Sequence, residues 1–205
     1  MQKMCVALAL LALAACKQIP ATKVIVYSKG KPTVNKDDLK IQVPENGSGA
    51  EDVVLQYFTE KNLSFEVSSG ANKTTIEASK EGVFIINARP DTIVGSYQNY
   101  GAPKKATSTV SQDEIKQRID SLEQLIVGKN VSAANRNFIV YPNTGVKLTN
   151  NPDAEVVAPF HQMTSVAVVE GKEAEVYRFY TTNEIREIIA KAKALQTAKP
   201  ADKKK

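Results

Sequence analysis

His161 is the only imidazole in the chain and therefore the only candidate for acid–base catalysis by a histidine. A catalytic histidine needs a nucleophile or an orienting carboxylate close to it in space. The neighbouring residues 159–163 contain neither. We therefore expect His161 to be exposed, or hydrogen-bonded within the fold, and not to be catalytic.

Carboxylates are the second group of side chains that could do chemistry. Glycosidase chemistry needs two carboxylates that face each other across a cleft, whereas adjacent acidic residues usually face solvent. The stretch 150–153 offers oxygen ligands, but no twelve-residue calcium loop with spaced ligands and a closing Glu follows it. Phosphate-binding, dinucleotide-binding, nucleophile-elbow and zinc-protease motifs are absent from the sequence. The acidic pairs are Asp37-Asp38, Glu51-Asp52 and Asp113-Glu114. We predict no catalytic residue, no metal, no cofactor and no enzymatic activity.

The N-terminal residues have the composition of an export signal. Lys3 gives a positive start, residues 4–12 are apolar, and Leu13-Ala14-Ala15-Cys16 follows. The apolar stretch is too short to span a bilayer of about 30 Å. A positive start, a short apolar run and small residues before a cleavage point are typical of an export signal.

The segment Leu13-Ala14-Ala15-Cys16 resembles the lipobox of bacterial lipoproteins at every position. The resemblance implies cleavage before Cys16, attachment of diacylglycerol to its thiol and acylation of the new N-terminus by a fatty acid such as palmitate. Two or three acyl chains anchor a protein stably, whereas one chain binds only marginally. The alternative is an ordinary cleaved signal that happens to end at a cysteine. With Cys5 removed and Cys16 lipidated, the mature protein has no free thiol, which excludes thiol catalysis.

The residues after Cys16 bear on the final location of the protein. Lys17 and Gln18 follow it, without an Asp at the next position. In an enterobacteria-like envelope the resemblance implies transfer to the outer membrane, facing the periplasm or the cell surface. In a Gram-positive host it implies the outer face of the plasma membrane.

The net charge of +5 is concentrated at the C-terminus. Residues 191–205 carry six Lys and one Asp, whereas the rest of the mature chain is close to neutral. A neutral body lacks the basic face of a nucleic-acid-binding protein, so we expect no nucleic acid as a partner. We expect residues 199–205 to form a basic disordered tail. The alternative is contact of Lys203, Lys204 and Lys205 with anionic lipid or cell-wall polymer, worth about 1 kcal/mol per Lys near a charged membrane.

The N-terminal half contains short alternating or β-branched segments separated by turns. This pattern predicts an Ig-like β-sandwich over residues 22–97, preceded by a signal peptide (1–15) and a lipidated tether (16–21). The stretch Gly82-Val83-Phe84-Ile85-Ile86-Asn87 resembles the late strand of bacterial Ig-like modules. The expected strands cover residues 23–27, 39–43, 53–58, 63–67, 74–78, 82–87 and 92–97.

The C-terminal half combines helices with strands. Residues 98–110 are expected to be a linker, followed by an α+β domain over 111–198 in which a small antiparallel sheet is packed on two helices. Ser111 and Glu114 form a capping box, as do Thr181 and Glu184, and each pair predicts the start of a helix. Ile185, Ile188 and Ile189 are expected on the buried face of the second helix. The expected strands cover 137–141, 145–149, 155–158, 165–169 and 175–180. The fold class is therefore mostly β with an α+β C-terminal part.

Tyr177 and Arg178 are the remaining candidates for contact with a ligand or surface. They belong to an alternating strand, for which a core face is the preferred interpretation and an aromatic ligand platform is the alternative. Three functions remain open. The first is a lipid-anchored envelope protein of non-enzymatic character, with a structural, assembly or protein-interaction role. The second is a lipoprotein that binds glycan, cell wall or a small ligand, and the third, more remote, is an enzyme whose site is scattered in the sequence. The expected partners are the membrane, through the acyl chains on Cys16, and an envelope protein or cell-wall polymer.

Overall fold

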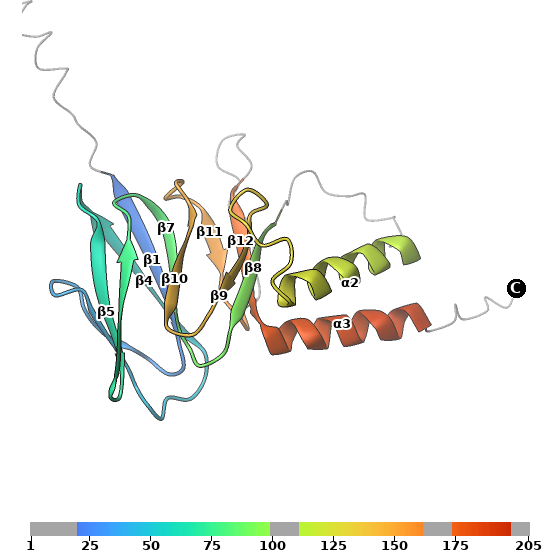
Figure 1. Cartoon of the computed structure of the whole chain (residues 1–205), viewed down its shortest axis with the longest axis horizontal. Helices are drawn as coiled ribbons and strands as arrows, with labels where there is room; N and C mark the ends of the chain where they lie inside the picture. The colour runs from blue at the N-terminus through green and yellow to red at the C-terminus, as the bar shows by residue number, and fades with distance from the viewer. Residues whose placement is uncertain (1–19, 99–110, 162–173, 198–205) are drawn as a thin grey trace, which may run out of the picture.

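The computed structural model describes residues 20–98, 111–161 and 174–197. These residues form twelve strands in three four-stranded sheets and two helices (Figure 1). The helices are α2 (Gln112–Ile126) and α3 (Thr182–Thr197). The strands are β1 (Ala21–Ser28), β2 (Thr33–Asn35), β3 (Lys40–Val43), β4 (Glu51–Phe58), β5 (Leu63–Ser69), β6 (Asn72–Ala78), β7 (Gly82–Ala88), β8 (Ile93–Gln98), β9 (Asn137–Val140), β10 (Thr144–Thr149), β11 (Glu155–Val157) and β12 (Val176–Thr181).

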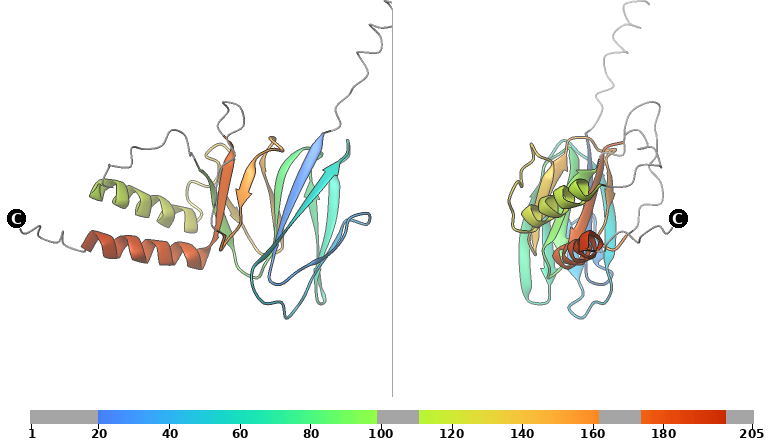
Figure 2. Two further views of the ribbon diagram at one scale, coloured as in Figure 1. Left: turned by 180° about the vertical axis from the view of Figure 1, so that it is seen from behind. Right: turned by 90° about the vertical axis from the view of Figure 1, so that its right-hand side faces the viewer.

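The three sheets are stacked face to face. The central sheet has the strand order β10-β7-β1-β4, and β1 pairs parallel with β7 and antiparallel with β4. The outer sheet, β2-β3-β5-β6, covers one face of the central sheet, and the helix-side sheet, β11-β12-β8-β9, covers the other. Figure 2 shows the same stack from behind and from the side that carries the helices.

The central sheet contributes to two hydrophobic cores because successive side chains of a strand point to opposite faces. In β1, Val24 and Val26 pack toward the outer sheet, whereas Ile25 and Tyr27 pack toward the helix-side sheet. All seven residues of β7 are buried. A strand covered on both faces needs such a continuous apolar run, in place of the alternation of a half-exposed strand.

The two helices form an antiparallel pair that projects from the helix-side sheet (Figures 1 and 2). Both predicted capping boxes are present: Ser111 Oγ accepts from the Glu114 N–H and Thr181 Oγ1 from the Glu184 N–H. Ile185 and Ile189 of α3 are buried in a third core, together with Ile119 of α2 and residues of the helix-side sheet. The expectation for Ile188 was wrong, because its side chain is 36% exposed.

The predicted fold class is confirmed: the chain is mostly β, with a sandwich and two helices in its C-terminal part. All seven strands expected before residue 98 are present, and β2 is an additional short strand. The strand expected over 165–169 and most of the linker expected over 98–110 lie outside the described residues.

The expected division into two units with separate cores needs correction. β8, placed in the N-terminal domain by its sequence position, pairs with β9 and β12 of the C-terminal half. Conversely, β10 pairs antiparallel with β7 and completes the central sheet. The two halves share sheets because the alternating pattern of a strand specifies its buried face but not its neighbours.

Candidate functional site

A shallow hollow lies at the end of the central sheet where β1 runs into its following turn, and its cavity volume for a water-sized sphere is about 10 Å³. A cavity needs about 10–15 Å³ on this measure to hold one water molecule. The hollow is therefore too small for a drug-sized ligand. Its lining residues are Tyr27, Ala50, Glu51, Asp52, Arg89, Ala158, Pro159 and His161.

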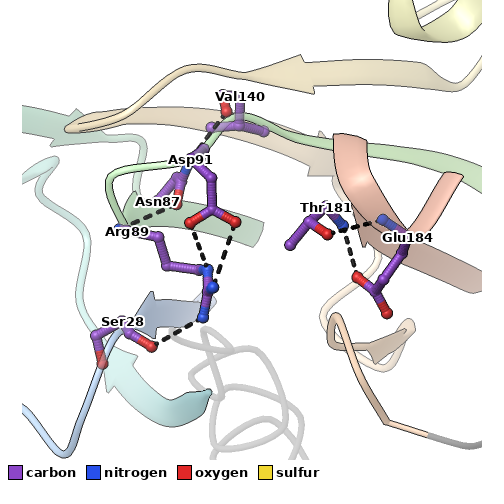
Figure 3. A network of polar contacts seen from close by, with 7 residues as sticks. All are labelled: Ser28, Asn87, Arg89, Asp91, Val140, Thr181 and Glu184. Atoms are coloured by element: carbon purple, nitrogen blue, oxygen red, sulfur yellow. Dashed lines mark hydrogen bonds and ion pairs between the residues drawn. The ribbon is translucent and has the colours of Figure 1, made fainter. Parts of the chain in front are cut away.

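Arg89 connects β7 to its surroundings at this hollow (Figure 3). Its Nε and Nη2 donate to the two carboxylate oxygens of Asp91 at 3.2 and 3.3 Å. Its Nη1 donates to the backbone carbonyl of Ser28 at 3.4 Å. Asn87 supports the turn, because its Nδ2 donates to the carbonyls of Asp91 and Val140, and its Oδ1 accepts from the Arg89 N–H. The guanidinium is thus held by β1 and by the turn between β7 and β8.

Tyr27 places a hydroxyl against the hollow. Its side chain is 1% exposed, and its Oη has no hydrogen-bond partner among the described residues. Burial, and secondarily the charge of Asp52, raises the pKa of the Tyr27 phenol far above its ordinary value. The phenol therefore stays protonated at neutral pH and cannot act as a base there.

His161 does have a carboxylate close to it in the folded chain. Its Nε2 lies 3.4 Å from Oδ1 of Asp52, and its Nδ1 lies 3.1 Å from the carbonyl of Pro159. The sequence around His161 does not reveal this carboxylate, because Asp52 belongs to β4 and is distant along the chain. Among the described residues, which end at His161 in this segment, the lining of the hollow contains no Ser, Thr or Cys that this pair could activate as a nucleophile. The His161 side chain is 51% exposed, in agreement with the expectation of an exposed histidine.

Phe160 is presented beside the same hollow in a left-handed backbone conformation, with φ at +65°. Its N–H donates to Oε1 of Glu184 at 2.8 Å, and the Arg89 guanidinium lies 5.5 Å from its ring centroid. Figure 3 shows Glu184 also bound to Thr181 at the start of α3. Arg89, Asp52 and Glu184 therefore attach residues 158–161 to three different elements.

A second polar network surrounds Glu175, just before β12. The carboxylate accepts hydrogen bonds from Tyr177 Oη at 2.7 Å, Asn151 Nδ2 at 3.0 Å and Thr149 Oγ1 at 3.2 Å, and Arg136 lies 3.9 Å away. Partial burial alone would raise the pKa of Glu175, but these donors and the Arg136 charge together lower it. The network joins β10 and β12 and is structural in character.

Tyr177 is not available as a surface contact. Its side chain is 1% exposed, and its ring packs edge-on against Phe138 and Tyr97, as the core interpretation of this strand requires. Arg178 points to the other face of β12, where its guanidinium lies 4.9 Å from the Tyr180 ring centroid. The other candidate residues, Cys16, Lys203, Lys204 and Lys205, lie outside the described residues.

Within residues 20–98, 111–161 and 174–197, no three His, Cys, Asp or Glu side chains are grouped so that they could hold a metal ion. In the same parts of the chain, no helix has both the length and the apolarity needed to cross a membrane. Neither family models nor curated proteins nor solved structures give a match to this chain.

Proposed function

We propose that this chain is the precursor of a bacterial envelope lipoprotein that is anchored through Cys16 and acts without catalysis, in a structural, assembly or protein-interaction role. The observation that carries the proposal is the segment Leu13-Ala14-Ala15-Cys16 after a short apolar run. In a Gram-negative host we expect the outer membrane, because Lys17 and not Asp follows the cysteine.

The position of the folded body is consistent with a lipid anchor. β1 begins at Ala21, five residues after Cys16. A chain spans at most about 3.6 Å per residue, so the Cα atoms of these two residues are at most about 18 Å apart. The β-sheet body would therefore lie directly on the membrane surface, where protein contacts can form.

The character of the described surface favours contacts over small-ligand chemistry. The hollow at Arg89 is smaller than a typical ligand pocket, and two of its lining side chains, Arg89 and Asp52, already contact Asp91 and His161. Large hydrophobic side chains, in contrast, are exposed on β4 and elsewhere. Exposed apolar residues that gather on one face commonly mark protein interaction sites.

The experiment is fractionation of cells that express the full chain with a Cys16→Ser substitution, combined with labelling by a radioactive fatty acid. We expect the parent to be labelled and to partition with membranes, and the variant to lose both properties. Cys5→Ser is the matched control and should behave like the parent, because residue 5 is removed with the signal. Persistent labelling and membrane association of the Cys16→Ser variant would overturn the proposal.

A further inference from the structure

The strands at the ends of the three sheets differ in how well they are protected against pairing with another chain. β2, β9 and β11 have only three or four residues. β10 contains a register shift, and Gly145 of β10 lies against Ile76 of the neighbouring edge strand β6. Short strands, bulges and covered edges are the usual protections of a sheet edge. Among the described edge strands, β4 has none of these three, and its only charged residues, Glu51 and Asp52, stand at its start.

β4 is a long and regular edge. It pairs with β1 over eight consecutive residues without a bulge, and among the described residues it has no partner on its other side. Its sequence, EDVVLQYF, contains neither Lys nor Pro. Val54 and Phe58 are 56% and 65% exposed and lie on the same face of the strand, opposite to Val53, Leu55 and Tyr57, which pack against the outer sheet.

We propose that β4 pairs antiparallel with β4 of a second copy of this chain, so that the central sheets of the two copies become continuous. In an edge strand, every second residue directs its N–H and C=O outward, and these residues must face each other in an antiparallel pair. Opposing residues must therefore both have even numbers or both have odd numbers. The two-fold axis must then pass midway between one residue of β4 and the same residue of the second copy, which we call the residue on the axis.

Only one of these registers pairs the two exposed apolar side chains with each other. With Gln56 opposite Gln56 of the second copy, Val54 faces Phe58 of the second copy, and this contact occurs twice. With Leu55 on the axis, Phe58 would face Asp52. With Tyr57 on the axis, Val54 would face Glu60. With Val54 on the axis, Val54 would face its own copy and Phe58 would face Ala50; with Phe58 on the axis, Val54 would face Asn62. Cross-strand apolar pairs stabilise a sheet, whereas an apolar residue opposite a charge does not.

The ends of β4 are compatible with this register. Glu51 comes beside the turn that carries Lys61 of the second copy, and both side chains are exposed. Asp52 comes beside Glu60 in the same turn, and this like-charge contact lies at the end of the pair, where Glu60 is exposed to solvent. An opposite-charge pair and an apolar pair therefore recur on both sides of the axis.

The test is site-directed disulfide cross-linking of the whole chain in cell envelopes. Opposing residues of an antiparallel pair have Cβ atoms about 4.5–5.5 Å apart and Cα atoms within the range that a disulfide spans. We expect Gln56→Cys to give at least tenfold more dimer on a non-reducing gel than Thr33→Cys, which is exposed on the edge strand β2. Val54→Cys and Phe58→Cys should cross-link strongly only when they are co-expressed. The parent chain controls for dimers formed through Cys5 or Cys16.

A second variant separates loss of pairing from loss of folding. Val54→Lys with Phe58→Lys, added to Gln56→Cys, should reduce the cross-linked dimer to the level of Thr33→Cys while the circular-dichroism spectrum stays that of the folded parent, because both side chains are exposed in the single chain. The inference is overturned if Gln56→Cys cross-links no better than Thr33→Cys, if Val54→Cys alone is as efficient, or if Gln56→Cys cross-links to a different protein.

Discussion

Gly95 should not tolerate even a methyl group, because it lies opposite Phe179 in the β8–β12 pair. A Cβ atom at residue 95 would be 2.5 Å from Cε1 and 2.6 Å from Cδ1 of the Phe179 ring. The ring cannot move away easily, because it is 1% exposed and packs against Tyr27. Gly95→Ala therefore forces either the ring or the strand to shift.

The expected cost follows from two opposing effects. Overpacking a well-packed core costs about 1–3 kcal/mol, whereas Ala in place of a strand Gly returns about 0.5–1 kcal/mol by restricting the unfolded chain. We expect a net loss of about 1–2 kcal/mol in the free energy of unfolding. For a chain of this size, this corresponds to a fall of about 2–8 °C in melting temperature.

Urea unfolding of Gly95→Ala, Phe179→Leu and the double variant measures the coupling. Leu at position 179 is smaller than Phe and makes room for the methyl group added at position 95. The free energy of unfolding of the double variant should therefore fall by at least about 0.5 kcal/mol less than the sum of the two single losses. Gly128→Ala is the control, since Gly128 has φ at +72° with nothing within 4 Å of its Cβ position, and its cost comes from the backbone alone. Phe179→Leu should not relieve that cost. Parent-like stability of Gly95→Ala, or additive losses in the double variant, would refute the steric argument.

Three further predictions concern the polar networks and are measured by urea unfolding. Tyr27→Phe should leave the free energy of unfolding unchanged or raise it, because the hydroxyl has no described partner, whereas Tyr177→Phe should lower it by about 1.5–3 kcal/mol through the lost hydrogen bond to a carboxylate. Because the pKa of Glu175 is lowered in the folded chain, its stabilising contribution is present above the ordinary carboxylate pKa of about 4.3 and is lost as pH falls through the lower folded value. Below about pH 4.3, the free energy of unfolding should therefore fall less steeply with decreasing pH in Glu175→Gln than in the parent. Parallel plots of this free energy against pH for parent and variant would contradict the prediction. Arg89→Met should cost about 2–3 kcal/mol, less than a fully buried pair, because Asp91 is 31% exposed; an Asp91→Asn variant that costs nothing would show that the ion pair is not the cause.

Local features of the fold follow from the sequence, because they depend on neighbouring residues. The capping boxes at Ser111 and Thr181 involve side chains three residues apart, and both form as expected. The strands before residue 98 are recognisable by alternation and β-branched residues. In α3, the periodicity places both Ile188 and Ile189 near one face, but the helix pair projects from the sheet and covers only Ile189.

The sheet order could not be derived in this way. β8 and β10 have the alternation and length of ordinary strands, and their partners depend on how the whole chain folds back. One signal was present in β7, since the run Val83–Ile86 is apolar at every position, which indicates a strand covered on both faces. The site is hidden for the same reason: Asp52 reaches His161, and Arg89 reaches Ser28, only through the packing of distant segments.

The proposed anchor and the proposed β4 pairing can be tested together through the orientation of the molecule. The two-fold axis of the pair is perpendicular to the sheets, so both outer sheets lie on one side and both helix pairs project on the other (Figure 1). Stacked sheets are about 10 Å apart, and Cys16 lies at most about 18 Å from the central sheet at Ala21. Both anchors can then reach a membrane that lies beneath the outer sheets.

This orientation predicts a difference in distance from the lipid. A fluorophore on Thr75→Cys, exposed on the outer sheet, should be quenched by spin-labelled lipid headgroups, whereas one on Lys191→Cys, exposed on α3, should not. The Cys16→Ser form of each variant is the control, because it should show no quenching at either position. Equal quenching at Thr75 and Lys191 in the anchored protein, or stronger quenching at Lys191, would mean that the sheets do not lie parallel to the membrane, even if anchoring and pairing each hold.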